Sequence, residues 1–291
     1  MVLIQTSRDL GSGVVFDDQG DVVTNDHVVG TATSFKVTLT GSTQPLSATL
    51  VGTYPADDLA VIRVAGAKGL HPAAFADSSK VQIGQIVLAM GNPLGLAGSV
   101  TNGIVSAVDR TVSEPSGGGS PGATLPQTIQ TSAAINPGNS GGALVDLAGQ
   151  VIGIPTLAAT DPQLGGGAAP GIGFAIASNI VKDVASQIVA HGKVVTSHRA
   201  ALEIRTGTVT DSNGQPAGSG IAAVNPGGAA DKAGLQTGDV ITAVNGTPTP
   251  TVQALSAVLA NLQPGQSVPL DVRHPDGTSK TVNVTLGTLP G

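Results

Sequence analysis

The stretch that decides the fold of this chain is Asn136-Pro137-Gly138-Asn139-Ser140-Gly141-Gly142, taken together with a histidine and an acid further upstream. Glycines before and after Ser140 allow the backbone to turn sharply and to direct its amide groups at one point. Alone, the stretch is a weak signal, because an ordinary hairpin turn has the same composition. A serine used for acyl transfer also needs a histidine that accepts its proton and a buried acid that orients this histidine.

Two upstream segments supply candidates for these partners. His27 follows the strand-like run Val22–Thr24, and Asp58 directly precedes the apolar run Leu59–Ile62. A lone histidine in apolar surroundings is more often a core residue than a catalyst, and a capped turn is the alternative interpretation of Asp58. However, a carboxylate at the start of a buried strand costs free energy unless it is paired, and a histidine is a suitable partner.

Together, the three residues indicate a catalytic triad much more specifically than any one of them alone. About 31 positions lead from His27 to Asp58, and about 82 from Asp58 to Ser140. This is the chymotrypsin-type order, and not that of subtilisin or the α/β-hydrolases. The sequence therefore predicts Ser140 as the nucleophile, His27 as its general base and Asp58 as the orienting acid. Backbone N–H groups of the turn at Gly138, Asn139 and Ser140 are predicted to form the oxyanion hole.

The composition agrees with a β-rich protein of two domains. The chain has 291 residues, of which 40% are hydrophobic, 41 are glycine and 19 are proline. Short runs of Val, Ile, Leu and Thr are separated by turn residues, which is typical of many short strands. The length is too great for one average domain and ample for two. No run approaches the roughly 18 apolar residues of a membrane-spanning helix.

Several classes of ligand are not expected. The net charge is -6 and no basic run occurs, so the sequence has no nucleic-acid footprint. Cysteine is absent, which excludes disulfides and thiolate metal sites. The remaining histidines lack metal-ligand spacing and are predicted to be solvated, so we expect no metal site: His71, His191, His198 and His274. We expect no cofactor either.

A strand-turn-strand pattern extends to about residue 177, with strands predicted near 2–6, 14–16, 22–24, 35–39, 48–51, 59–64, 86–89, 103–108, 128–131, 143–145, 151–154 and 173–176. The glycine-rich stretches Ser113–Ala123 and Ala158–Gly171 are predicted as loops, either plain linkers or mobile loops beside the active site. Helical spacing predicts a helix over Asn179–His191, which Ser178 caps and Gly192 ends. This helix closes a first domain of residues 1–196.

The motifs resemble those of the HtrA family of trypsin-like serine proteases, which includes DegP and DegS, over nearly the whole chain. The matching segments are Gly11–Val14, Thr24–Val29, Asp58–Val61, Gly91–Gly95, Gly103–Ala107, Gln130–Leu144 and Gly171–Ile176. The resemblance implies a mostly β fold, in which a chymotrypsin-like double β-barrel precedes a smaller α/β PDZ domain. It also selects Asp58 over Asp57, because the family acid directly precedes a Leu-Ala or Ile-Ala pair.

The same resemblance implies an ATP-independent endopeptidase that cuts unfolded, misfolded or damaged proteins. It maps the S1 pocket onto Ile154, Pro155 and Thr156, and implies an aliphatic P1 residue. Family members usually have Asn where this chain has Pro155. The proline lacks a backbone N–H, which changes the expected pocket. The competing hypothesis is a proteolytically silent chaperone or peptide-binding module with the same fold.

Residues 197–291 resemble a PDZ domain, which binds C-terminal peptides by adding a strand to a sheet edge. Strands are predicted over 221–224, 240–244, 268–273 and 280–286, and helices over 229–233 and 252–262. The carboxylate-binding loop maps onto Ala201, Leu202, Glu203 and Ile204. Family members usually have glycine at Glu203, and a carboxylate there repels a ligand carboxylate unless it points away. A docking domain with little peptide affinity is therefore the alternative.

Met1 is followed at once by the strand-like Val2–Thr6. We therefore expect that a native N-terminal signal or anchor is missing from this sequence. The resemblance implies an extracytoplasmic protein, which is periplasmic, at the cell surface or secreted. The resemblance implies a homotrimer for a full-length parent, whereas this chain alone is equally compatible with a monomer.

Overall fold

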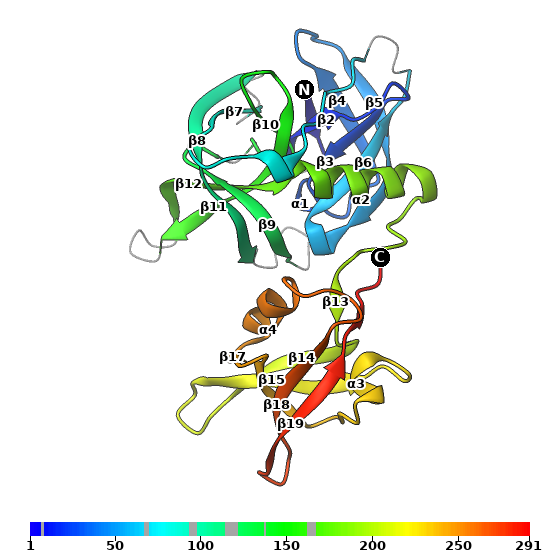
Figure 1. Cartoon of the computed structure of the whole chain (residues 1–291). Coiled ribbons are helices and arrows are strands. Elements are labelled where there is room, and N and C mark those ends of the chain that lie inside the picture. Colours follow the sequence, from blue (N-terminus) through cyan, green and yellow to red (C-terminus); the bar gives the residue numbers. More distant parts are fainter. Residues whose placement is uncertain (7–8, 67–69, 93–97, 114–121, 137, 162–166) are drawn as a thin grey trace. The chain divides into compact units, whose positions relative to one another are not determined.

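The computed structural model describes residues 1–6, 9–66, 70–92, 98–113, 122–136, 138–161 and 167–291. Contacts divide the chain into two units, Met1–Val194 and Val195–Gly291 (Figure 1). The fold is mostly β, as the sequence predicts. None of the helices formed by the described residues combines the length and the apolar composition needed to cross a lipid bilayer.

The first unit begins with a closed β-barrel in the strand order β1-β2-β3-β6-β5-β4. The predicted hairpin forms, with Val14 opposite Val23. Alternate side chains such as Ile4, Val22 and Ile62 fill the barrel. Its elements are β1 (Val2–Gln5), β2 (Leu10–Val15), β3 (Asp21–Thr24), α1 (Asp26–Val29), β4 (Ser34–Leu39), β5 (Pro45–Tyr54), the 3₁₀ helix η1 (Pro55–Asp57) and β6 (Leu59–Val64).

A second closed barrel follows in the order β10-β11-β12-β9-β8-β7, which confirms the predicted double-barrel fold. Its elements are the 3₁₀ helix η2 (Ser78–Lys80), β7 (Ile86–Gly91), β8 (Ser99–Ser113), β9 (Thr124–Thr131), β10 (Ala143–Val145), β11 (Val151–Asp161) and β12 (Gly167–Ala177).

The two predicted glycine-rich loops have different outcomes. The prediction of a loop over Ala158–Gly171 is wrong for its described ends, because β11 and β12 pair there, with Thr160 opposite Ala168. Glycine weakens a strand but does not prevent main-chain pairing when a neighbouring strand supplies the partners. Most of the predicted loop Ser113–Ala123 lies outside the described residues; its first residue ends β8.

Helix α2 (Ser178–His191) packs on both barrels. Its Val181, Val184 and Ile188 share a buried cluster with Val23 of the first barrel and Leu125 of the second. The predicted end at Gly192 is confirmed, since this residue adopts φ +73. The predicted cap is wrong: Ser178 lies inside the helix and its hydroxyl donates to Ala76 O at 2.9 Å.

The second unit forms one sheet in the order β14-β15-β16-β18-β19, with β17 paired to β16, and a small sheet of β13 and β20. Figure 1 shows α3 and α4 on different sides of this sheet. Strand β14, at one edge of the sheet, is not among the predicted strands. The elements are β13 (Ala200–Ala201), β14 (Ile204–Thr210), β15 (Pro216–Val224), α3 (Ala229–Lys232), β16 (Val240–Val244), β17 (Thr247–Pro248), α4 (Val252–Leu259), β18 (Ser267–Arg273), β19 (Ser279–Thr285) and β20 (Gly287–Thr288).

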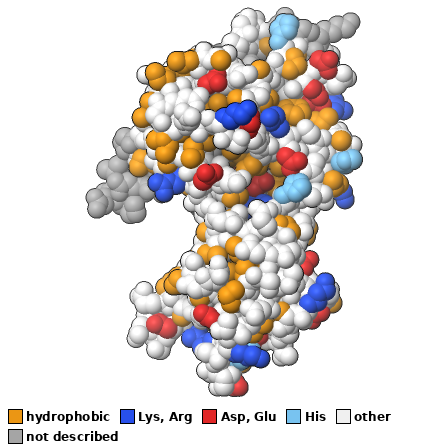
Figure 2. All heavy atoms as spheres, viewed as in Figure 1, with side chains coloured by type: hydrophobic (Ala, Val, Ile, Leu, Met, Phe, Trp, Pro, Cys, Tyr) orange, Lys and Arg blue, Asp and Glu red, His pale blue; other side chains and the backbone are white. Residues whose placement is uncertain are grey.

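Charged residues make up only 11% of the chain. Figure 2 shows Lys and Arg interspersed with Asp and Glu on the face in view. A nucleic-acid-binding surface would instead gather basic side chains into a patch or stripe.

Candidate active site

Strand pairing places His27 beside Asp58. β3 and β6 are neighbours in the first barrel, so the residues just after β3 lie next to those just before β6. The carbonyl oxygen of Asp58 accepts hydrogen bonds from Asp26 N at 3.2 Å and from Asn25 Nδ2 at 2.9 Å. These bonds tie the start of α1 to the end of η1 and hold both main chains in place.

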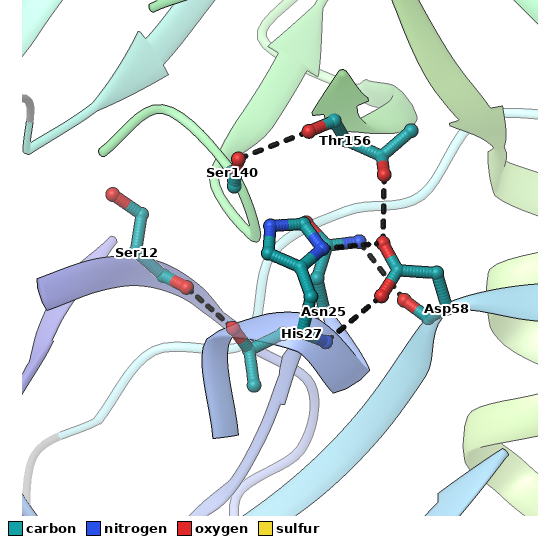
Figure 3. Close-up of polar contacts among 7 residues, drawn as sticks. Ser12, Asn25, His27, Asp58, Ser140 and Thr156 are labelled. Atoms are coloured by element: carbon teal, nitrogen blue, oxygen red, sulfur yellow. Dashed lines mark hydrogen bonds and ion pairs between the residues drawn. The ribbon is translucent and has the colours of Figure 1, made fainter. Parts of the chain in front are cut away.

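The Asp58 carboxylate binds His27 at two points, the main-chain N–H and the imidazole (Figure 3). Oδ1 accepts from the main-chain N–H of His27 at 2.9 Å, and Oδ2 lies 2.9 Å from His27 Nδ1. Thr156 Oγ1 also donates to Oδ2, at 2.7 Å. Asp58 is fully buried, whereas the His27 side chain is 32% exposed. Since a carboxylate oxygen accepts hydrogen bonds and does not donate them, Nδ1 carries a proton, and Nε2 is the nitrogen that can accept another.

Ser140 lies across the imidazole from Asp58 (Figure 3). Its hydroxyl donates to Thr156 O at 3.0 Å. Thr156 therefore contacts Ser140 through its main chain and Asp58 through its side chain. Transfer of the Ser140 proton requires the hydroxyl to exchange this carbonyl for Nε2 of His27.

Gly141 permits the turn that presents Ser140. It adopts φ +77, which L-residues rarely occupy. A Cβ at this position would collide with Ser12 O and Thr24 Oγ1. Both the conformation and the space therefore require glycine directly after Ser140.

We expect Gly141→Ala to lower the free energy of unfolding by about 3 kcal/mol, from overpacking added to left-handed backbone strain. Gly149→Ala is a matched control, because Gly149 has φ +76 but no atom within 4 Å of an added Cβ. The control should lose only about 1–2 kcal/mol. Urea unfolding measures both losses, and equal values would contradict the steric argument.

The three predicted oxyanion residues are not equivalent. The N–H of Asn139 donates to Asn136 O at 2.9 Å, so it is used inside the turn. Asn139 Nδ2 donates to Ala134 O at 3.1 Å, and the residue is buried. The N–H groups of Gly138 and Ser140 remain the candidate oxyanion donors.

The predicted S1 residues are all buried. The Ile154 side chain lies in the core cluster with α2, and the Thr156 side chain contacts Asp58. Pro155 O accepts from Gly141 N at 3.1 Å, so the proline braces the nucleophile turn with its carbonyl. Any S1 wall built here is therefore formed by the main chain of Pro155 and Thr156 and not by the Ile154 side chain.

Sequence reasoning missed the contacts that Thr156 and Asn25 make with Asp58. Asn25 lies in the matching segment Thr24–Val29, two residues before His27, but its amide could equally have faced solvent. Thr156 is 98 residues from Asp58 in the chain. Only the packing of one barrel on the other brings these two together, so no local signal could have found the contact.

The predicted carboxylate-binding loop lies between β13 and β14. Leu202 O accepts from Ala230 N at 3.1 Å, which ties the loop to α3. Glu203 adopts φ +58, a left-handed conformation in which glycine is favoured. Its Oε2 accepts from Ala229 N at 2.7 Å, and Gly228 and Gly287 leave room for this side chain. The Glu203 carboxylate therefore points toward α3.

One predicted surface histidine is not simply solvated. His274 Nδ1 lies 2.7 Å from Oδ1 of Asp239, and the Asp239 side chain is only 2% exposed. Within the part of the chain that the structure describes, no three His, Asp or Glu side chains gather in a metal-binding arrangement.

Comparison with known proteins places this geometry in a family. The model of the trypsin-like peptidase domain matches residues 11–154, and that of the PDZ domain matches residues 220–274. Serine protease PepD of Mycobacterium tuberculosis is 41% identical over 95% of this chain and 60% of its own length. Periplasmic serine endoprotease DegP of Escherichia coli K12 is 42% identical over 95% of this chain and 56% of its own. The chain thus spans a little over half the length of these relatives.

Solved structures of related proteases match this chain over most of their own length. The HtrA-type protease AlgW with a decapeptide has a TM-score of 0.64 and 34% identity, and the match covers 97% of this chain and 83% of that one. AlgW with a tripeptide has a TM-score of 0.65 and 33% identity, covering 100% and 94%. Because the chain has the double barrel and the PDZ unit and matches HtrA-type structures at 33–34% identity, it belongs to the HtrA family of trypsin-like serine proteases.

Proposed function

We propose that the chain is an ATP-independent serine endopeptidase, with its peptidase domain in residues 1–196 and its PDZ domain in residues 197–291. The observation that carries the proposal is the double attachment of His27 to the Asp58 carboxylate, at 2.9 Å from both N and Nδ1, with Ser140 across the ring. This arrangement directs a basic imidazole nitrogen at a serine in a chymotrypsin-type barrel pair.

In the proposed reaction, Ser140 Oγ attacks the scissile carbonyl carbon while Nε2 of His27 takes its proton. The N–H groups of Gly138 and Ser140 stabilise the negative oxygen that develops. His27 then gives the proton to the leaving amine, and an acyl-enzyme remains. Water then attacks the carbonyl carbon of this ester while Nε2 of His27 takes a proton from the water. His27 passes that proton to Ser140 Oγ as the ester bond breaks, which releases the acid product and restores Ser140. Asp58 stays ionised throughout and stabilises the imidazolium.

For the specificity of cleavage, we propose that an aliphatic P1 side chain lies beside the main chain of Pro155 and Thr156. The carbonyl of Thr156 that now accepts from Ser140 becomes available to a substrate N–H when the hydroxyl turns to His27. Because this contact uses a carbonyl, the missing N–H of Pro155 does not affect it.

For the second unit, we propose that C-terminal peptides add a strand to β14. β14 is one of the two edge strands of its sheet, and α4 lies beside it, with Val252 N donating to Thr208 Oγ1 at 3.2 Å. The Glu203 carboxylate is directed at Ala229 N. Its charge is thereby partly satisfied and turned toward α3, which supports binding of a ligand carboxylate at the loop.

We expect Glu203→Ala to lower the stability of the second unit by about 2 kcal/mol, because it loses a charge-assisted hydrogen bond but keeps a left-handed backbone. Glu203→Gly loses the same bond and relieves about 1 kcal/mol or more of backbone strain, so its loss should be smaller. Urea unfolding of both variants gives the difference. Equal stability of Glu203→Ala and the native chain would show that the bond to Ala229 is unimportant.

The proposed substrates are unfolded, misfolded or damaged proteins, and the proposed location is extracytoplasmic. The support is that relatives over 40% identical are named periplasmic serine endoproteases. A homotrimer of a longer parent protein is proposed by the same family argument, and light scattering of this chain distinguishes it from a monomer.

A fluorophosphonate probe and casein digestion together test the enzymatic proposal. We expect the native chain to become labelled at Ser140 and to degrade unfolded casein without ATP. A folded native chain that neither reacts nor digests would instead support the silent chaperone hypothesis.

A further inference from the structure

The position of Ser12 follows from the glycines on either side of it. In β2, a Cβ at Gly11 would collide with Val28, and a Cβ at Gly13 would collide with Val22 and Ile4. Positions 11 and 13 therefore face the interior of the first barrel. Because side chains alternate along a strand, Ser12 faces outward. It is nevertheless 0% exposed, because the second barrel covers it.

The Ser12 hydroxyl joins the nucleophile turn to the second barrel. It donates to Gly138 O at 2.6 Å and accepts from Asn92 N at 2.8 Å. Asn92 N also lies 3.3 Å from Gly138 O, and Asn92 Nδ2 donates to Val2 O at 3.0 Å. Asn92 Nδ2 also lies 3.3 Å from the Ser12 hydroxyl oxygen. With both Asn92 nitrogens as donors, the hydroxyl oxygen accepts, and its one proton is directed at Gly138 O.

The main chain of Ser12 contacts the same turn. Ser12 N donates to Ser140 O at 3.0 Å, and Ser12 O accepts from Thr24 Oγ1 at 2.7 Å. Ser12 thus holds Gly138 O through its side chain and Ser140 O through its main chain. These two carbonyls belong to the residues on either side of Asn139. Both attachments come from the barrel that carries His27.

The polar groups around the Ser140 N–H are otherwise satisfied. Asn139 N donates to Asn136 O at 2.9 Å, Gly141 N to Pro155 O at 3.1 Å, and Gly142 N to Asn139 O at 2.9 Å. With the peptide groups on both sides held by Ser12, the peptide that carries the Ser140 N–H has little freedom to rotate. This N–H is one of the two proposed oxyanion donors.

We infer that Ser12 is a positioning residue for the oxyanion hole, whose hydroxyl fixes the Gly138 carbonyl and so aims the donors of the turn. This inference rests on the proposed serine peptidase activity. The donors matter most when the carbonyl oxygen becomes negative, so the hydroxyl should affect the transition state more than substrate binding.

Ser12→Ala tests the inference in the full chain, with kcat and KM measured on a peptide substrate with an aliphatic P1 residue. We expect kcat to fall on the order of 10- to 100-fold, less than the loss of a whole oxyanion donor, with KM nearly unchanged. The inhibition constant of the matching peptide boronate, whose tetrahedral adduct fills the oxyanion hole, should rise by a similar factor. A purely structural role would not weaken boronate binding in proportion to kcat.

Thr128→Val is the matched control. Thr128 is also fully buried, and its hydroxyl donates to Arg110 O at 2.8 Å, where β9 pairs with β8. It should lose stability similar to Ser12→Ala but keep native kcat and boronate affinity. Should Ser12→Ala fail to fold, Ser12→Cys retains a weak donor and should show the same parallel loss in milder form.

Native kcat and boronate affinity in folded Ser12→Ala would overturn the inference, as would a loss confined to KM or an equal loss in Thr128→Val. These outcomes leave the proposed peptidase activity intact, because the native chain is active in all of them. A native chain without hydrolysis or boronate binding would overturn both.

Discussion

Ser140→Ala should reduce kcat for peptide hydrolysis on the order of 10⁶-fold, to the level left by substrate binding and the oxyanion hole alone. The substitution removes the only atom of the turn that can form an acyl-enzyme. The fold should persist, because the lost hydrogen bond is a single one of 3.0 Å to Thr156 O at a partly buried position. Single-turnover hydrolysis and fluorophosphonate labelling measure the loss, and circular dichroism checks the fold.

Ser42→Ala is the control for this prediction. Ser42 is an exposed serine between β4 and β5, and its hydroxyl accepts from Gln44 N at 3.1 Å and donates to Gln44 O at 3.5 Å. Its replacement should leave labelling and casein digestion at native levels. Labelling that survives in Ser140→Ala would mean that another residue is the nucleophile, and the assignment of Ser140 would be wrong.

Asp58→Asn should lower kcat by about 10⁴-fold with the structure retained. The carboxylate accepts from His27 N on Oδ1, and from His27 Nδ1 and Thr156 Oγ1 on Oδ2. An asparagine has one oxygen for these two sides. The main-chain N–H of His27 cannot turn away, whereas a hydroxyl rotates and an imidazole can change its tautomer.

The asparagine oxygen should therefore face His27 N, and its amide should face Nδ1. Nδ1 then becomes the acceptor and Nε2 carries the proton, so the imidazole cannot act as a base toward Ser140. Steady-state kinetics measures the loss, and a nitrogen NMR spectrum of the histidines reports the tautomer. In the double variant with Ser140→Ala, no further loss of kcat is expected, because the residues act as one unit.

Asp57→Asn is the matched control, since Asp57 is also buried and directly precedes Asp58. It should change stability more than kcat. A loss in Asp57→Asn as large as that in Asp58→Asn would refute the choice of Asp58 as the orienting acid.

The sequence predicted well where a local pattern is sufficient. The hairpin of Val14 and Val23 and the end of α2 at Gly192 depend on alternation and turn chemistry within a few residues. The pattern failed over Ala158–Gly171, because glycine content reports turn preference and not the presence of a partner strand. It also misplaced the helix cap at Ser178, whose hydroxyl found a carbonyl acceptor, Ala76 O, 102 residues away.

The sequence by itself determined the class of fold, the order of His27, Asp58 and Ser140, and the presence of a PDZ unit, because these depend on periodicity, spacing and motifs that are continuous in the chain. Only the tertiary structure decided that Thr156 contacts Asp58 and that the Ser12 hydroxyl holds Gly138 O, 126 residues away. The physical reason is that the closure of each barrel, and the packing of one on the other, set these contacts. Neither barrel closure nor barrel packing is encoded within the reach of any local pattern.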